Sequence, residues 1–367
     1  MNECKDIILA VDYHSEKMTI RQLNMVTGEE RVQDYPTARA TILRLVESAV
    51  VQAGRQGGRV RWLMESTTGW ARVRELIGGR VDFGLVNVLQ MPLPPKAHRR
   101  KSDKIDTGRM LREELNGSLP RAFQPDRNWR QARRLVDART DLVHRQTQLK
   151  NWVSSLLHHE TWAERSGLWS DKGRARLRAL RLPDSDRFVL DLKLEQLARV
   201  ESWLAEVEAR MMELYQQWPL AHWVDQVRGI GPVTAVALLA HIGPVSRFRT
   251  AQELIAYAGL APGYRQSSDR RQDGHIGGGG TDGQLRFLVI EATRWLREIP
   301  RYRATYERVV KKRGKKVAKL VLARLFLRSL HKMLKDRIQF NQAPAVAASG
   351  MRSMSASGRR VCRATPA

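Results

Sequence analysis

Cysteine is nearly absent from this chain, which has 2 among its 367 residues, Cys4 and Cys362. Because they lie at opposite ends, they form neither a disulfide framework nor the paired spacing of a zinc site. Apolar runs are short, since none reaches the roughly 18 residues that a membrane-spanning helix needs. The N-terminal residues lack a basic stretch ahead of their apolar run, which argues against a signal peptide. We therefore expect a cytoplasmic protein with no membrane partner.

Acidic residues are scarce relative to basic ones, with 38 Asp and Glu against 64 Lys and Arg, a net charge of +26. The excess begins after the first ninety residues: the net charge is +1 over 1–90, +8 over 96–150 and +12 over 301–340. A near-neutral region followed by basic ones is typical of a catalytic module joined to a body that binds nucleic acid. The charge distribution therefore favours nucleic acid as the partner.

Short apolar or alternating runs predict five strands in the first ninety residues, with helices after the third, fourth and fifth. A three-stranded meander followed by strand–helix alternation is the element order of the ribonuclease H-like fold. We predict an α/β domain of this class over residues 1–125. The predicted strands are 6–12, 17–23, 30–35, 59–64 and 81–88, and the predicted helices are 37–53, 69–77 and 104–116.

The remainder is predicted to be mostly helical. Proline and glycine are rare over 127–217, and apolar residues recur every three or four positions from Leu190 to Val207, which predicts a long helix beginning near Pro183. This coiled-coil segment, 126–217, either packs as a hairpin on its own domain or forms a dimer interface. We predict a second compact, mostly α domain over 218–340 and a disordered tail over 341–367.

Four acidic residues follow or begin predicted elements. Asp12 ends the first strand and Glu65 the fourth, and Asp103 and Asp106 lie three apart where a helix begins. If the first and fourth strands are neighbours, the first two carboxylates emerge side by side, and the Asp pair on one helix face completes the group. Such a cluster requires cations, and oxygen ligands favour Mg²⁺, with Mn²⁺ as the alternative. Each acid taken singly is also compatible with a cap or turn role.

Other segments point to phosphate binding. The turn Gly229-Ile230-Gly231 before Pro232 resembles a helix-hairpin-helix, whose backbone N–H groups reach a phosphate, although a tight helix–helix turn fits equally. Ser267 and Ser268 are expected in a polar loop, and a serine needs activation to act as a nucleophile. The basic candidates for nucleic-acid contact are Arg99, Arg100, Lys101, Lys104, Arg265, Arg270, Arg271, Lys311, Lys312, Arg313, Lys315 and Lys316.

From Asp6 to about Gln339 the chain resembles the transposases of the insertion sequence 110 family, which are bridge-RNA-guided recombinases. The resemblance rests on AVDYH, MESTTGW and KSDKID, and then on RGIGPVTAVALLAHIG, ELIAYAGLAPGYRQSS and GGGG…LR. It implies a RuvC-like domain whose catalytic, metal-binding acids are Asp12, Glu65, Asp103 and Asp106. It also implies a transposase domain with a nucleophilic serine. Ser268 matches that serine better than Ser267, although Asp269 stands where the family usually has glycine.

The resemblance implies a mechanism in which Ser268 attacks a phosphate of DNA and forms a phosphoserine intermediate. It implies donor DNA, target DNA and a guide noncoding RNA as partners, and a homo-oligomer, dimer or tetramer. It also implies a bacterial protein associated with the nucleoid. Two alternatives stay open at this point. One is a metal-dependent nuclease or junction resolvase without a covalent intermediate, and the other is a nucleic-acid-binding protein without activity.

Overall fold

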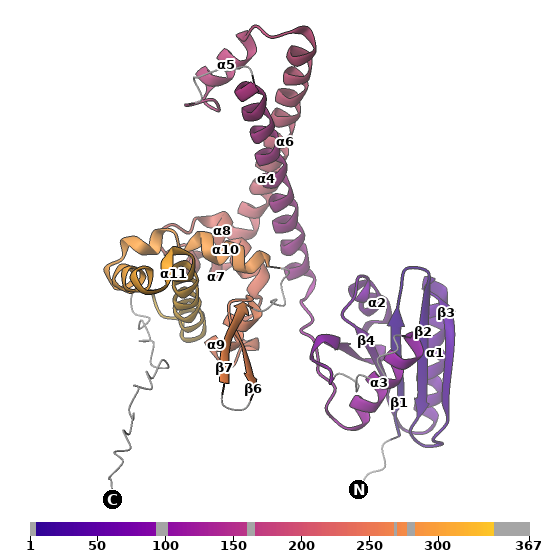
Figure 1. Ribbon diagram of the computed structural model, residues 1–367. Coiled ribbons are helices and arrows are strands. Elements are labelled where there is room, and N and C mark those ends of the chain that lie inside the picture. Colours follow the sequence, from indigo (N-terminus) through magenta and orange to yellow (C-terminus); the bar gives the residue numbers. More distant parts are fainter. Residues whose placement is uncertain (1–4, 93–101, 160–165, 268–269, 277–282, 341–367) are drawn as a thin grey trace, which may run out of the picture. The chain divides into compact units, whose positions relative to one another are not determined.

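The computed structural model describes residues 5–92, 102–159, 166–267, 270–276 and 283–340 (Figure 1). The chain folds into two compact units, Met1–Gln124 and Pro125–Ala367. In these described ranges, no helix combines the length and the apolar character needed to cross a bilayer. The predicted tail, 341–367, lies outside the described residues.

The first unit is built on one five-stranded sheet with the order β3-β2-β1-β4-β5. β1 pairs with β2, and β2 with β3, in antiparallel register, whereas β1–β4 and β4–β5 are parallel. The predicted adjacency of the first and fourth strands is therefore confirmed. The strands are β1 (Ile7–Tyr13), β2 (Lys17–Asn24), β3 (Glu30–Pro36), β4 (Val60–Glu65) and β5 (Asp82–Val86).

Helices cover both faces of this sheet. α1 (Arg39–Arg55) and α2 (Trp70–Ile77) share one apolar cluster with alternate strand residues, including Leu9 and Trp62. α3 (Asp103–Leu115) packs on the other face in a second cluster, which includes Ala10 and Leu63. Side chains alternate between faces along a strand, so buried apolar runs such as IILAV supply both cores. All eight elements lie within three residues of their predicted bounds.

In the second unit, two long helices pack against each other: α4 (Arg127–His159) and α6 (Asp184–Gln217), with the short α5 (Asp171–Ala179) between them in sequence (Figure 1). α6 begins after Pro183, as predicted. Leu190, Leu197 and Val200 of its apolar seam are buried. Because α4 covers this seam, packing of α4 and α6 as a helical hairpin explains most of the apolar repeat in α6.

The rest of the second unit surrounds α8 (Pro232–Ile242), which is buried from Ala235 to Ile242. Further helices complete one large apolar cluster with it. They are α7 (Pro219–Val224), α9 (Ala251–Tyr257), α10 (Gln284–Ala292) and α11 (Pro300–Asp336).

The segment predicted as a polar loop with two serines folds differently. β6 (Pro262–Ser267) and β7 (Arg270–Ile276) form a two-stranded antiparallel sheet in which Ser267 pairs with Arg270. The loop prediction was therefore wrong on both sides of residues 268–269, because backbone pairing between the two segments overrides their polar, glycine-containing composition. Ser268 and the glycine run at 277–282 lie outside the described residues.

Candidate functional site

Asp12 and Glu65 lie at the ends of neighbouring parallel strands, Asp12 as the penultimate residue of β1 and Glu65 as the last residue of β4. The last paired residues of β1 and β4 are Val11 and Met64, so each acid is the next residue along its strand. Val11 and Met64 contribute to the core under α1 and α2. Alternation then directs Asp12 and Glu65 to the opposite face, which α3 covers. The register of the sheet thus places both acids on the face that α3 covers, and Asp12 lies beside the first turn of that helix.

Asp103 and Asp106 occupy that first turn. The helix begins there because Ser102 is its N-cap, with the Ser102 hydroxyl accepting a hydrogen bond from Ile105 N at 3.3 Å. Arg21 of β2 donates from Nη2 to the carbonyl oxygen of Lys104 at 2.9 Å. A side chain from the sheet therefore holds the turn that carries both carboxylates.

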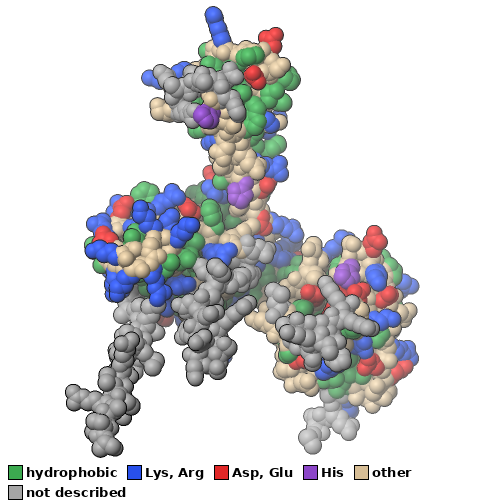
Figure 2. All heavy atoms as spheres, viewed as in Figure 1, with side chains coloured by type: hydrophobic (Ala, Val, Ile, Leu, Met, Phe, Trp, Pro, Cys, Tyr) green, Lys and Arg blue, Asp and Glu red, His purple; other side chains and the backbone are tan. Residues whose placement is uncertain are grey.

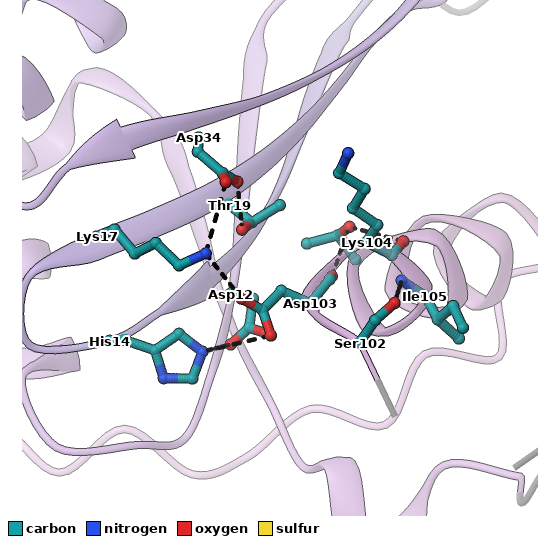
Figure 3. A network of polar contacts seen from close by, with 10 residues as sticks. Asp12, His14, Lys17, Thr19, Asp34, Ser102, Asp103, Lys104 and Ile105 are labelled. Carbon is teal, nitrogen blue, oxygen red and sulfur yellow. Dashed lines mark hydrogen bonds and ion pairs between the residues drawn. The ribbon is translucent and has the colours of Figure 1, made fainter. Parts of the chain in front are cut away.

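Two nitrogen-bearing side chains, His14 and Lys17, face Asp12 and Asp103 (Figure 3). His14 Nε2 lies 3.4 Å from Asp12 Oδ1 and 3.8 Å from Asp103 Oδ1. Lys17 Nζ lies 3.6 Å from Asp103 Oδ2 and 3.5 Å from Asp34 Oδ2. The Lys17 ammonium therefore partly neutralises the carboxylates of Asp34 and Asp103.

The environment of Asp12 disfavours its negative charge. The side chain is 8% exposed, and this burial raises the pKa of the carboxyl above its ordinary value of 3.8. His14 opposes the shift, whereas the charges of Asp103 and Asp106 increase it. Asp34, and then Asp103, raise the pKa of Lys17. A buried carboxylate facing two further acids is a favourable position for a cation.

Of the four predicted acids, the structure brings Asp12 and Asp103 into close contact range and leaves Asp106 and Glu65 outside that group. Asp12 and Asp103 form a compact group with His14, whose possible ligand atoms all lie within 4.8 Å of one another. Asp106 lies near enough to act on Asp12 electrostatically, and it pairs with Arg109 at 3.3 Å. Glu65 is half-buried at the end of β4 and is not part of the compact group.

His14 was missed by the sequence analysis, which considered only carboxylates. The signal was present, because residues two apart on an extended chain share a face, and His14 follows Asp12 by two. Lys17 begins β2, and the turn between β1 and β2 brings it beside His14, where His14 N donates to Lys17 O at 3.0 Å.

The other end of α3 is also fixed to the sheet. The Glu114 carboxylate accepts from Arg121 Nη2 at 2.7 Å and from Arg61 Nη1 at 3.3 Å. Arg61 of β4 also pairs with the buried Asp6 at 2.7 Å. Gly84 leaves room for the Arg121 guanidinium, which a side chain at position 84 would overlap. The helix that carries two acids is therefore held at both ends.

The predicted phosphate-binding turn has a packing role at one glycine. Gly229 has a φ of +85°, and a Cβ there would overlap the Trp295 side chain. Gly231 is the N-cap of α8 and has open space where a Cβ would lie. The tight-turn alternative therefore explains Gly229, while phosphate contact at this turn stays a prediction.

The basic run near the C-terminus surrounds a break in α11. Gly314 adopts a φ of 81° and a ψ of 168° within the helix, so the chain turns there. Five exposed cations flank the break, and we refer to them as the basic corner: Lys311, Lys312, Arg313, Lys315 and Lys316. Figure 2 shows Lys and Arg side chains gathered over the part of the second unit that carries α11.

The remaining predicted contacts are placed only in part. Lys104 is exposed on α3. Arg99, Arg100 and Lys101 lie outside the described residues. For the hairpin arginines the structure gives strand positions alone: Arg265 lies in β6, and Arg270 and Arg271 lie in β7.

Comparisons with known proteins point to one family. Residues 221–307 match the model of the transposase IS116/IS110/IS902 family. A putative transposase y4qE from Sinorhizobium fredii is 24% identical over 309 residues, which cover 76% of each chain. The insertion element IS110 43.6 kDa protein of Streptomyces coelicolor is 32% identical over 142 residues, 38% of this chain and 35% of the relative.

A third relative, the insertion element IS116 44.8 kDa protein of Streptomyces clavuligerus, is 26% identical over 255 residues, 67% of this chain and 63% of the relative. The family match spans α7 to the start of α11, including the β6–β7 hairpin, and the relatives extend the similarity over most of the chain. The chain is therefore similar to transposases of the IS116/IS110/IS902 family, both in the matched segment and over most of its length.

Proposed function

We propose that this protein is a transposase of that family, and that it cuts and rejoins DNA with a carboxylate site in its first unit and a serine in its second. One observation supports the proposed carboxylate site. The register of β1 and β4 directs Asp12 and Glu65 to one face of the sheet. That face is covered by α3, whose first turn carries Asp103 and Asp106. The strand order and the helices on both faces support a ribonuclease H-like classification of this unit.

The donor set fits a divalent cation. Asp12 is buried, and burial disfavours the negative charge of its carboxylate. Asp103 and Asp106 add further negative charge beside it. Asp12, Glu65, Asp103 and Asp106 would hold Mg²⁺, with Mn²⁺ as the alternative, because carboxylate oxygens suit both ions. When bound, the metal supplies electrostatic stabilisation of charge that develops on phosphate oxygens.

Ser268 is the proposed nucleophile, on the resemblance of its segment to the family. Its hydroxyl oxygen forms a bond to phosphorus, and the bond from phosphorus to the 3′ oxygen breaks. The serine proton is lost to solvent or a base, and the leaving oxygen takes up a proton to become a 3′-hydroxyl. Ser267, the last residue of β6, is the alternative nucleophile.

The basic corner would hold nucleic-acid backbones, which its five exposed cations suit because phosphate contacts do not depend on sequence. Donor DNA, target DNA and a guide noncoding RNA are the proposed partners, with base pairing to the RNA supplying the choice of sequence. The protein would then need to recognise shape and charge alone.

A homo-oligomer, dimer or tetramer, is the proposed assembly. α4 covers most of the α6 seam, yet Phe188, Leu192 and Trp203 of α6 stay exposed. Leu192 and Trp203 line a groove of about 650 Å³ between α6 and α4, together with Trp152. An exposed apolar stripe of this kind is the surface that a second copy would cover.

A denaturing gel tests the proposed chemistry. The protein is incubated with its cognate RNA, labelled donor and target DNA, and Mg²⁺. We expect a labelled protein band that survives denaturation, is lost in Ser268→Ala and Asp12→Ala, and is kept in Ser267→Ala. Cleaved DNA without such a band, unaffected by either serine change, would instead establish a metal-dependent nuclease. Nucleic-acid binding with no cleavage would favour a binding protein without activity.

A further inference from the structure

His14 lies in a turn whose backbone is fixed from both sides. Its own N–H donates to Lys17 O at 3.0 Å, which closes the turn between β1 and β2. Thr37 secures the next two residues, with Oγ1 donating to Ser15 O at 2.8 Å and N donating to Glu16 O at 3.1 Å. The imidazole therefore projects from a held backbone, and its side chain is 53% exposed.

The imidazole faces the carboxylates of Asp12 and Asp103, and the nitrogen–oxygen distances are close to those between two ligands of one metal ion. His14 Nε2 lies 3.4 Å from Asp12 Oδ1 and 3.8 Å from Asp103 Oδ1 (Figure 3). Neighbouring ligands around an octahedral ion at about 2.1 Å stand about 3 Å apart. The nitrogen thus needs to move by less than about 1 Å, which rotation of a half-exposed side chain allows.

A neutral imidazole has a lone pair that coordinates metals, and the protonated ring has none. An imidazole nitrogen that lies between two carboxylates can coordinate an ion that both carboxylates also bind. Lys17, the other side chain facing Asp103, offers three donors and no acceptor. Of these two side chains, only His14 can therefore bind a metal ion.

We propose that His14 Nε2 is a ligand of the ion held by Asp12 and Asp103, and that it makes this site prefer Mn²⁺ to Mg²⁺. The proposal rests on the carboxylate site of the proposed function. Mg²⁺ strongly prefers oxygen ligands, whereas first-row transition ions accept imidazole nitrogen together with carboxylates. A mixed oxygen and nitrogen set therefore gains more with Mn²⁺ than an all-carboxylate set.

The test measures metal binding directly, on the full chain without DNA. Mn²⁺ is titrated and followed by electron paramagnetic resonance, and pulsed measurements on the bound ion detect coupling to ¹⁴N. Wild type is compared with His14→Gln, with Asp12→Asn, and with His144→Gln as a matched control, since His144 is exposed on α4 in the other unit. Mg²⁺ affinity is obtained by competition against Mn²⁺. Circular dichroism checks that each variant is folded.

We expect nitrogen coupling in wild type and in His144→Gln, and its loss in His14→Gln. Loss of this ligand should weaken Mn²⁺ binding about tenfold or more, because even the outer partners of metal ligands contribute about 10–100-fold in affinity. Mg²⁺ affinity should change by less than that, so the preference for Mn²⁺ falls.

Two results would overturn the proposal while leaving the carboxylate site intact. The first is Mn²⁺ binding that is lost in Asp12→Asn but shows no nitrogen coupling in wild type. The second is an equal weakening of Mn²⁺ and Mg²⁺ in His14→Gln, which indicates only an electrostatic or structural effect. Failure of wild type to bind Mn²⁺ at all, or binding unchanged in Asp12→Asn, would contradict the proposed carboxylate site itself.

Discussion

Replacing Gly229 by alanine should destabilise the second unit through a steric effect at one tryptophan. The added Cβ would lie 2.5 Å from Trp295 Cβ and nearer still to the indole ring, well inside the ~3.5 Å at which carbon atoms attract. Overpacking of this kind costs about 1–3 kcal/mol. The φ of +85° adds about 1 kcal/mol for a residue with a side chain.

The expected loss is therefore about 2–4 kcal/mol, or roughly 4–16 °C in the melting temperature of a unit of this size. Differential scanning calorimetry without nucleic acid measures it. Gly231→Ala is the matched control, because its Cβ would meet nothing within 4 Å, and we expect a loss below about 1 kcal/mol there.

Adding Trp295→Ala to Gly229→Ala should recover part of the loss, since it removes the overlapped side chain. DNA affinity is measured at a temperature where all variants are folded. A Gly229→Ala protein with wild-type stability, or one in which Trp295→Ala gives no recovery, would refute the packing explanation. Normal stability together with weakened DNA binding would instead support the phosphate contact predicted for this turn.

Three further predictions concern the carboxylate site and the helical hairpin. Arg21→Met should lower DNA cleavage about tenfold with little change in the circular dichroism spectrum, because the carbonyl of Lys104 loses its donor and small displacements of catalytic groups are costly; unchanged cleavage would contradict this. Burial raises the pKa of the Asp12 carboxyl in the folded state. The contribution of Asp12 to the free energy of unfolding is therefore fully present below its unfolded pKa of about 3.8, and it is lost as the pH rises through the folded pKa, because the buried carboxylate becomes charged. Asp12→Asn should therefore raise the melting temperature in chelator at pH 7.5, and the gain should shrink on acidification; a lower melting temperature at pH 7.5 would show the reasoning to be wrong. Leu197→Ala, at a fully buried position of α6, should cost about 2–5 kcal/mol, whereas Leu192→Ala, 42% exposed, should cost under about 1 kcal/mol in the same thermal melts; equal costs would argue against burial of the seam by α4.

The strands and helices of the first unit could be predicted from the sequence because each of them has a clear local pattern. Apolar runs such as that ending at Asp12 and periodic helices allow each element to be located locally. The same logic placed α6 after Pro183. Short-range pattern and long-range packing agree at these elements.

The contacts that were missed depend on residues far apart or on polar strands. The β6–β7 hairpin contains Pro262 and Gly263 and few apolar residues, so its pairing is not visible in composition. Arg21 contacts a helix 83 positions further along the chain, a relation that no local window contains. His14 is different, because its two-residue spacing from Asp12 is a local signal that the sequence contains.

The alternation that places Asp12 and Glu65 on one face has a consequence for how such a site can change over evolutionary time. A single-residue insertion or deletion inside β1 or β4 would turn one acid toward α1 and α2 while leaving the other in place. The loops that flank the strands can lengthen without this effect. Length variation compatible with activity should therefore concentrate outside the strands, and a chain with one residue gained within β4 would lose the site although every one of its acids is retained.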